Sequence, residues 1–335
     1  MKNKVLITGA SGFIGSFLVE EAFRQGHEVY AGIRKSSSRA YLQDERIHFI
    51  ELDLSSQEAL EKQFAELLKG PGAFDYVVHN AGITFAQGKD DFLRVNYEYT
   101  RNLTNALQAC GLPLKKFVLI SSLAAFGPGH DKTFAPINVS DTQRPISSYG
   151  RSKLKAEEHV KSLSDFPYLI LNPTGVYGPR DKDFHVFMKL INKGFEPYIG
   201  ASRQMISVLY VKDLARAVVL SMASSSVRRS YLVSDGAGYD KEDLGTTIRT
   251  ILGRKTFKIK LPMVPLRWVI SVVEKMYLLF GRQPFLNVEE LNEISSANWL
   301  CESDQVWSDL GTSPEFSLEQ GIRETIMWYK ENNWL

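Results

Sequence analysis

The stretch T-G-A-S-G-F-I-G at residues 8–15 decides the fold of this 335-residue chain. It follows the apolar run K-V-L-I (4–7) and opens a helical periodicity that extends to about residue 25. Gly9, Gly12 and Gly15 allow a tight turn and a close approach of the backbone to an anion. Three glycines also fit an ordinary βα turn, but their place after the first strand predicts a pyrophosphate cradle at a helix N-terminus.

Apolar strands alternate with helices through the first half of the chain. We expect strands over 5–8, 28–33, 47–52, 76–81, 116–122 and 168–173, and helices over 13–25, 56–68, 90–110 and 148–163. Strands that are apolar throughout are typical of a parallel sheet covered on both faces. The predicted fold class is therefore α/β, a Rossmann-type doubly wound sheet that binds ligands beyond the carboxyl ends of its strands.

The order of elements changes after about residue 175. We expect residues 1–174 to form the NAD(P)-binding Rossmann domain and 175–335 to form a smaller, mostly helical lobe that binds substrate. Within the second range, the stretch 206–235 is predicted to return to the main sheet.

Composition excludes several classes of protein. The net charge is +2 and no long Lys/Arg block occurs, so we expect no nucleic-acid partner. Cys110 and Cys301 lack metal-ligand spacing, so we expect neither a metal site nor a disulfide. A strand pattern begins within four residues of the start and leaves no room for a signal peptide, which indicates a cytoplasmic protein.

The segment 261–280 is the most hydrophobic in the chain. Two prolines, Arg267 and the pair Glu274-Lys275 interrupt it, so we expect no membrane span. A buried or pocket-lining amphipathic helix is the main interpretation, and an interfacial helix on a membrane or a partner remains open.

The segment after the second strand bears on the identity of the cofactor. NAD sites usually place a carboxylate about 20 residues after the glycines to bind the ribose 2′-hydroxyl. Residues 29–43 contain no carboxylate, but they do contain Arg34, Lys35 and Arg39. Guanidinium groups suit a 2′-phosphate, so we predict NADP(H) as the preferred cofactor, with NAD(H) and a merely solvated basic loop as the alternatives.

Three residues form a candidate catalytic set. Tyr149 and Lys153 are four apart on a predicted helix and therefore share one face, although this spacing also arises by chance. A nearby ammonium favours a phenolate, which makes Tyr149 a candidate acid/base. Ser122 closes the predicted strand 116–122, where it could bind the reacting oxygen or simply cap a turn.

Together these motifs resemble one known family, the extended short-chain dehydrogenase/reductases, over nearly the whole chain. This family includes nucleotide-sugar epimerases and dehydratases, and the sequence is closest in character to its 3β-hydroxysteroid dehydrogenases and dihydroflavonol reductases. The matching motifs are T-G-A-S-G-F-I-G (8–15), D-L (53–54), H-N-A-G (79–82), N-P-T-G-V-Y-G-P (172–179) and V-L-Y-V-K-D-L-A-R-A (208–217). The matching single residues are Asn96, Ser122, Tyr149 and Lys153.

The resemblance implies roles for particular residues. Ser122, Tyr149, Lys153 and Asn96 would be catalytic, with Tyr149 as the acid/base and Lys153 lowering its pKa and holding the nicotinamide ribose. The implied cofactor contacts are Gly9, Ser11, Gly12, Phe13, Ile14, Gly15, Arg34, Lys35, Asp53, Leu54, Asn80, Ala81, Gly82, Tyr149, Lys153, Pro173 and Val176. A homodimer through the helices 90–110 and 148–163 is also common in this family.

Two departures from the family pattern guide the expected function. Asn172 replaces the usual arginine, and the uncharged run I-S-V-L (206–209) lacks the arginine with which epimerases often grip a diphosphate. Trp268, Tyr277 and Phe280 suit an apolar substrate. We therefore expect an NAD(P)-dependent reductase or dehydrogenase acting on a small, fairly apolar molecule. The alternatives are a nucleoside-diphosphate-sugar epimerase or dehydratase and a non-catalytic NADP-sensing regulator.

Overall fold

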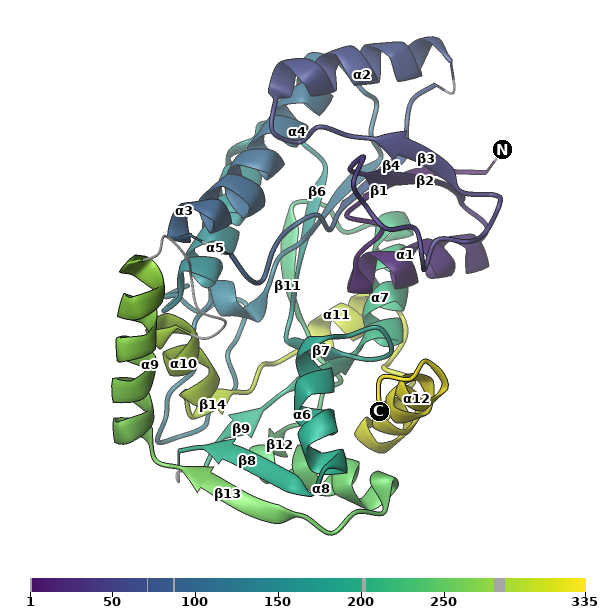
Figure 1. The fold of residues 1–335 in the computed structure, drawn as a ribbon. Helices are drawn as coiled ribbons and strands as arrows, with labels where there is room; N and C mark the ends of the chain where they lie inside the picture. Colours follow the sequence, from purple (N-terminus) through teal and green to yellow (C-terminus); the bar gives the residue numbers. More distant parts are fainter. Residues whose placement is uncertain (1, 71, 87, 201–202, 280–286) are drawn as a thin grey trace.

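The computed structural model of the protein describes residues 2–70, 72–86, 88–200, 203–279 and 287–335. Seven parallel strands form one sheet, and in order along it they are β11 (Arg229–Val233), β6 (Tyr168–Pro173), β5 (Lys116–Ile120), β4 (Tyr76–His79), β1 (Lys4–Thr8), β2 (Glu28–Ile33) and β3 (His48–Glu51) (Figure 1). The order reverses between β1 and β4, which is the switch point of a doubly wound sheet. The predicted fold class is therefore confirmed.

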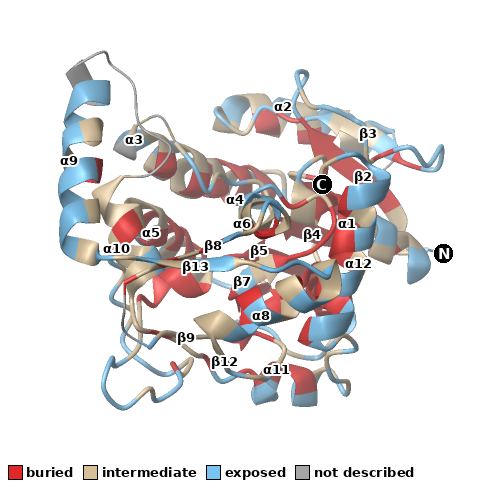
Figure 2. Cartoon of the chain, turned by 60° about the horizontal axis from the view of Figure 1, so that its bottom comes forward, coloured by how far each residue is buried: buried red, intermediate tan, exposed pale blue. Residues whose placement is uncertain are grey.

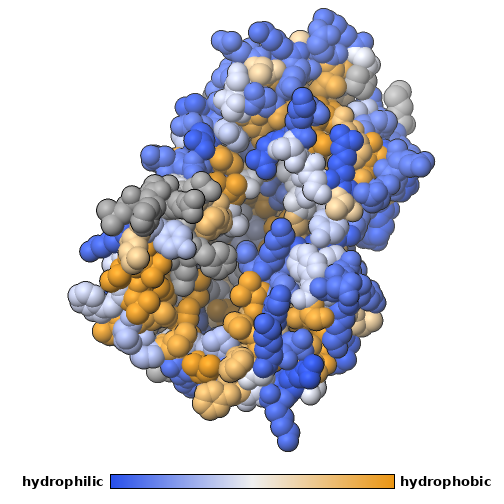
Figure 3. Space-filling model, viewed as in Figure 1, coloured by the Kyte–Doolittle hydropathy of each residue, from blue (hydrophilic) through white to orange (hydrophobic). Residues whose placement is uncertain are grey.

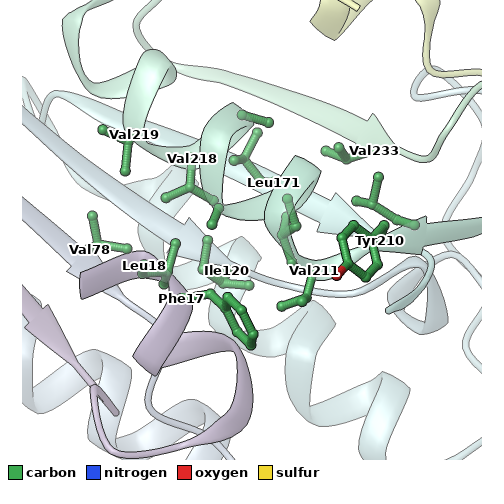
Figure 4. Close-up of a cluster of buried hydrophobic side chains, with 14 of the residues drawn as sticks. Phe17, Leu18, Val78, Ile120, Leu171, Tyr210, Val211, Val218, Val219 and Val233 are labelled. Atoms are coloured by element: carbon green, nitrogen blue, oxygen red, sulfur yellow. The ribbon is translucent and has the colours of Figure 1, made fainter. Parts of the chain in front are cut away.

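Helices cover both faces of this sheet. One face packs against α1 (Phe13–Arg24) and α7 (Val211–Ala223), and the other packs against α2 (Gln57–Lys69), α4 (Tyr99–Ala109) and α5 (Ser148–Ser162). Successive strand residues enter opposite layers, since Val5 and Ile7 join the first core and Leu6 joins the second. Figure 2 shows the buried strands between half-exposed helices, and Figure 4 shows apolar side chains of α1, α7 and several strands meeting in the first layer.

The predicted helix 90–110 is divided in the structure. It consists of α3 (Lys89–Phe92), a π-helical segment (Leu93–Glu98) and α4, and Asn96 lies in the π-helical segment. π-Helical turns insert one extra residue per turn and are frequent at functional sites. Apolar periodicity gives no sign of such an insertion, because the flanking α-helical faces remain in phase with their own cores.

The second lobe contains more β-structure than the sequence suggests. Its helices are α6 (Asp183–Asn192), α8 (Lys241–Leu252), α9 (Met263–Leu279), α10 (Val288–Ser295), α11 (Asp304–Asp309) and α12 (Leu318–Glu331). Within the described residues, three small sheets accompany them: β7 (Gly175–Tyr177) with β10 (Val208–Tyr210), β8 (Phe195–Ile199) with β13 (Phe257–Leu261), and β9 (Met205–Ile206) with β12 (Tyr239–Asp240) and β14 (Asn298–Trp299).

The stretch 206–235 is shared between the two parts of the fold. β11 joins the main sheet beside β6, and α7 covers that sheet. β10 pairs with β7 instead, in a small sheet outside the seven-stranded one. Its predicted return to the main sheet is therefore wrong for β9 and β10. No helix among the described residues has the length and hydropathy needed to cross a bilayer.

Candidate active site

The glycine turn between β1 and α1 has room for an anion and none for side chains. Gly9 has a φ of +66°, and a Cβ on it would lie 2.8 Å from Cα of Ala81. A Cβ on Gly15 would lie 2.1 Å from the carbonyl oxygen of Gly9. Gly12 is the N-cap of α1 and has no side chain with which to cap it. The turn therefore fits a bound phosphate, with Ser11, Phe13 and Ile14 partly exposed around it.

The residues that follow β4 lie against this turn. The backbone N–H of Ala81 donates to Oγ1 of Thr8 at 3.2 Å, and Nδ2 of Asn80 lies 3.4 Å from the carbonyl oxygen of Gly9. Asn80, Ala81 and Gly82 are thus beside the glycine turn at the carboxyl edge of the sheet, as the sequence predicts for a shared ligand site.

His79 fastens this edge to the next helix. The hydroxyl of Thr100 donates its proton to the carbonyl oxygen of Asn96 at 2.7 Å. Oγ1 of Thr100 is therefore an acceptor toward His79, and Nε2 of His79 donates to it at 3.0 Å. The other ring nitrogen, Nδ1, then accepts from Thr8 at 2.8 Å. Burial, with a smaller contribution from the charge of Lys153, lowers the pKa of His79 to about 3. His79 is therefore a neutral structural link in a fixed tautomer.

The side chain of Asn96 holds the loop after β4 against α5. Its Oδ1 accepts from the backbone N–H of Ile83 at 2.8 Å, and its Nδ2 donates to the carbonyl oxygen of Ile83 and to Oγ of Ser152. Ser152 in turn donates to the carbonyl oxygen of Tyr149 at 2.7 Å. Asn96 positions the candidate acid/base through this chain of contacts, and its direct contact with a substrate stays a prediction.

Tyr149 and Ser122 come together from α5 and from the end of β5. Ser122 is the N-cap of a short 3₁₀ turn, and its hydroxyl lies close enough to Tyr149 to influence the pKa of the phenol. Burial raises the pKa of Tyr149 to about 12, and the hydroxyl of Ser122 opposes that rise. The phenol is therefore protonated at neutral pH and is a hydrogen donor, as a general acid must be.

Lys153 lies one helical turn beyond Tyr149 but binds elsewhere. Its Nζ donates to the carbonyl oxygen of Ile120 at 2.6 Å, and a Cβ on Gly82 would lie 3.8 Å from that Nζ. Desolvation lowers the pKa of Lys153 to about 8. The resemblance implied that Lys153 lowers the pKa of Tyr149. In this structure the pKa of Tyr149 is raised, because burial of the phenol dominates and the ammonium is engaged by a backbone carbonyl.

A pocket opens beside Tyr149 between the sheet domain and α10. Its described lining includes Thr84, Phe92, Glu289, Glu290 and Glu293, and no Lys or Arg is among the described residues that line it. Burial raises the pKa of Glu293, which is hydrogen-bonded to Ser147. A larger hollow between α1 and the loop 40–47 is lined by none of the predicted site residues. The pocket beside Tyr149 is therefore the candidate substrate site.

Comparison with known families identifies the chain. Residues 5–233 match the model of the NAD-dependent epimerase/dehydratase family. The protein belongs to this family. That range contains every predicted site residue, from Gly9 to Val176, so the resemblance to the extended short-chain dehydrogenase/reductases is confirmed.

Some relatives of this protein are named as reductases or dehydrogenases, and others are named as epimerases. The chain is similar to a ceramide reductase of Caulobacter vibrioides, 26% identical over 99% of this chain and 96% of the other. It is also similar to a decarboxylating sterol-4-alpha-carboxylate 3-dehydrogenase of Dictyostelium discoideum, 24% identical over 97% and 100%. The solved UDP-glucose 4-epimerase of Thermotoga maritima has the same fold, with a TM-score of 0.78, 21% identity and coverage of 98% and 99%. The protein is an NAD(P)-dependent oxidoreductase of the extended short-chain type.

One buried residue beside the candidate site, Glu157, was not predicted from the sequence. Glu157 is fully buried one turn beyond Lys153, and its carboxylate accepts hydrogen bonds from four side chains: Ser121, Asn172, Gln143 and Lys161. Its charge raises the pKa of Lys153, against the desolvation that lowers it. Glu157 therefore ties α5 to the ends of β5 and β6. The spacing Y-x-x-x-K-x-x-x-E, with all three residues on one helix face, was the available signal.

The residues predicted to contact the adenosine part of the cofactor lie at the ends of β2 and β3. Arg34 and Lys35 are exposed directly after β2, and neither side chain makes a hydrogen bond or an ion pair with the described residues. Arg39 instead stacks over Phe49, with 4.1 Å between Cζ and the ring centre. Asp53 accepts from Ser55 in a turn after β3.

Asn102 of α4 holds the loop beside that turn in place. Its amide donates to the carbonyl oxygens of Leu54 and Ser55, each at 3.1 Å. On the other side of the switch point between β1 and β4, Pro173 is the last residue of β6. Val176 lies on β7, in register with Leu209 of β10. The contacts of Asp53, Leu54, Pro173 and Val176 with a cofactor stay predictions.

The substitution Lys153→Met will remove a pH-dependent contribution to the free energy of unfolding of the protein. Folding lowers the pKa of Lys153 from 10.5 to about 8, so between these values the unfolded chain binds more protons. The free energy of unfolding of the wild type therefore rises with pH across this window, by about 2 kcal/mol between pH 8 and pH 10. Urea unfolding of both proteins at each pH measures the difference, and equal pH dependence in the two proteins would contradict the assigned shift.

Proposed function

We propose that the protein is an NADP(H)-dependent reductase or dehydrogenase that interconverts a carbonyl and a hydroxyl group of a small, fairly apolar substrate. The observation that carries this proposal is the position of Tyr149 in the lining of the pocket, beside Ser122, with Lys153 and the glycine turn at the same edge of the sheet. Proton donor, cation and phosphate cradle are the three parts that carbonyl reduction by a dinucleotide requires of a protein.

The residues divide the work as follows. When bound, the reduced nicotinamide supplies a hydride to the carbonyl carbon. Ser122 donates a hydrogen bond to the carbonyl oxygen and holds it beside Tyr149. Tyr149 donates its phenolic proton to that oxygen, which gives the alcohol, and the phenolate is then reprotonated from solvent. Lys153, whose Nζ lies beside Gly82 at the cofactor edge of the sheet, would hold the nicotinamide ribose.

The protonation state of Tyr149 favours reduction over oxidation. With a pKa of about 12, the phenol holds its proton at neutral pH and can give it to the carbonyl oxygen directly. Oxidation of an alcohol requires the phenolate instead, so its rate should increase with pH until the phenol has ionised.

The basic pair after β2 supports NADP(H) as the preferred cofactor. Arg34→Glu places a carboxylate where a 2′-phosphate would bind, so we expect the Kd for NADPH to rise at least about tenfold, with the Kd for NADH unchanged or lower. Fluorescence titration of both cofactors measures the two constants. Arg323→Glu on α12 is the control, an arginine exposed to a similar degree and remote from the glycine turn. Tighter binding of NADH than NADPH by the wild type would contradict the proposal.

A nucleoside-diphosphate-sugar epimerase or dehydratase is the second candidate, because the family and the solved relative include such enzymes. A diphosphate requires cationic partners, whereas the described residues that line the pocket beside Tyr149 include three glutamates and no Lys or Arg. Arg203, the nearest arginine before β9, faces Asp240 at 3.6 Å. These observations favour the reductase.

Two measurements separate the candidates. A reductase releases its cofactor during purification and gains no thermal stability from a UDP-sugar or dTDP-sugar. An epimerase retains its cofactor, and its melting temperature rises with the sugar nucleotide. The second outcome would replace the reductase proposal.

A further inference from the structure

Helix α9 is mostly apolar, with a few charged residues, but buries only one side. Leu266, Ile270 and Val273 are buried or half-buried on the side that faces the protein, where α10 packs against α9. A large apolar helix surface is normally covered by the protein itself or by a partner. α9 instead stands at the edge of the molecule, where Figures 1 and 2 show its outer side uncovered.

The outer side of α9 is a continuous apolar stripe. Positions four apart lie on one helix face, and the side chains of this face are exposed as follows: Val264 71%, Trp268 72%, Val269 59%, Val272 52% and Met276 55%. Pro265 lies among them and is also exposed. Figure 3 shows hydrophobic atoms gathered at the left of the molecule, where Figure 1 places α9. We call Val264, Trp268, Val269, Val272 and Met276 the α9 stripe.

Basic residues lie on α9 and in the segment that precedes it in the chain. From residue 254 to residue 279 the chain has a single acidic residue, Glu274, which is half-buried and accepts a hydrogen bond from the backbone of Val288. The same stretch has six exposed basic residues: Arg254, Lys255, Lys258, Lys260, Arg267 and Lys275. Glu242 of α8 pairs with Lys258 and Lys260 but cannot balance the whole set. The helix that exposes the stripe therefore has two exposed basic side chains, Arg267 and Lys275, and one half-buried acidic side chain, Glu274.

We propose that α9 docks the protein on the surface of an anionic lipid bilayer. The stripe would enter the boundary between headgroups and acyl chains, where indole and aliphatic side chains are stable. Arg267 and Lys275, which are exposed on α9 itself, would face anionic headgroups. The helix lies in the plane of the interface, which agrees with the finding that no described helix has the properties of a span.

The charges favour a bilayer over a second copy of the chain. Two copies that joined through α9 would bring Arg267 and Lys275 of one copy close to the same residues of the other, without acidic partners on the helix face to offset them. A lipid surface supplies the opposite charge and has no such repulsion.

Docking through α9 would bring the candidate substrate pocket close to the lipid. α9 packs on α10, and α10 contributes Glu289, Glu290 and Glu293 to the pocket beside Tyr149. An apolar substrate could then enter from the bilayer. This last step rests on the proposed function, whereas docking itself does not and is tested without any substrate.

The test is flotation of the full-length protein with vesicles of equal parts phosphatidylglycerol and phosphatidylcholine, and with phosphatidylcholine alone. We expect binding to the anionic vesicles, weaker binding in high salt, and little binding to the neutral ones. Met276→Glu and Trp268→Glu should each weaken binding to the anionic vesicles by about tenfold or more. Met327→Glu on α12 is the matched control, because that methionine is equally exposed at 55%, and it should bind like the wild type.

Equal binding by Met276→Glu, Trp268→Glu and Met327→Glu, or no binding by the wild type, would overturn the proposal. Sedimentation velocity identifies the other occupant: a wild-type dimer that Met276→Glu converts to a monomer would assign the stripe to a second copy. NADPH affinity, measured on every variant, shows that the sheet domain remains folded. Loss of vesicle binding with intact carbonyl reduction leaves the proposed function standing, so the two proposals fail separately.

Discussion

Tyr149→Phe will lower kcat for carbonyl reduction by about 10² to 10⁴, the range that a general acid contributes. Phenylalanine keeps the ring, which packs edge-on against Phe92 with centroids 6.1 Å apart, and removes only the proton that the substrate oxygen receives. The Kd for NADPH should stay within about twofold of the wild-type value, since no cradle residue changes. Steady-state kinetics and fluorescence titration measure the two quantities.

Tyr97→Phe is the control for Tyr149→Phe. Tyr97 lies in the π-helical segment, where its ring contacts His159, and it is absent from the lining of the candidate pocket. Its loss of a hydroxyl should leave kcat unchanged. Full activity of Tyr149→Phe would show that another group supplies the proton, and the role of Ser122 would then fail with that of Tyr149.

Gly15→Ala will disrupt the phosphate cradle. Its methyl group would lie 2.1 Å from the carbonyl oxygen of Gly9 and 2.8 Å from Cα of Ala10, and both are backbone atoms that cannot rotate away. Alanine is better than glycine inside a helix by about 1 kcal/mol, but such overpacking costs about 1–3 kcal/mol and moves the turn itself. We expect the Kd for NADPH to rise at least about tenfold.

Gly70→Ala is the control for Gly15→Ala. Gly70 ends α2 with a φ of −108°, and a Cβ there would meet nothing within 4 Å. It should bind NADPH like the wild type. Isothermal titration of both variants measures affinity, and thermal unfolding measures stability. Wild-type affinity in Gly15→Ala would mean that the cofactor binds away from this turn.

The main sheet could be predicted from the sequence because its strands are apolar throughout. The runs 28–33 and 168–173 have the predicted bounds, β1 and β3 agree to within one residue at each end, and β4 and β5 end two residues earlier than expected. Burial on both faces makes such strands stand out against their polar loops. The glycine turn could be placed for the same reason, since it follows the first of these strands directly.

The second lobe and the polar networks could not be predicted in this way. β9, β12 and β14 have two residues each, which is too short for any periodicity to show. Glu293 reaches the pocket from a helix 144 residues beyond Tyr149, and nothing local in the sequence indicates that approach. The raised pKa of Tyr149 likewise depends on burial by distant segments, whereas Y-x-x-x-K spacing alone suggested a lowered one.

Transfer of deuterium from labelled NADPH is the most direct test of hydride transfer to an external substrate. The wild-type protein is incubated with NADPH carrying deuterium at the reactive nicotinamide carbon and with a panel of apolar ketones and aldehydes, and the products are analysed by mass spectrometry. We expect net oxidation of NADPH and one deuterium on the carbinol carbon of a product, with neither seen in Tyr149→Phe. No label in any alcohol product, together with epimerisation of a UDP-sugar without net use of cofactor, would contradict the proposed reductase.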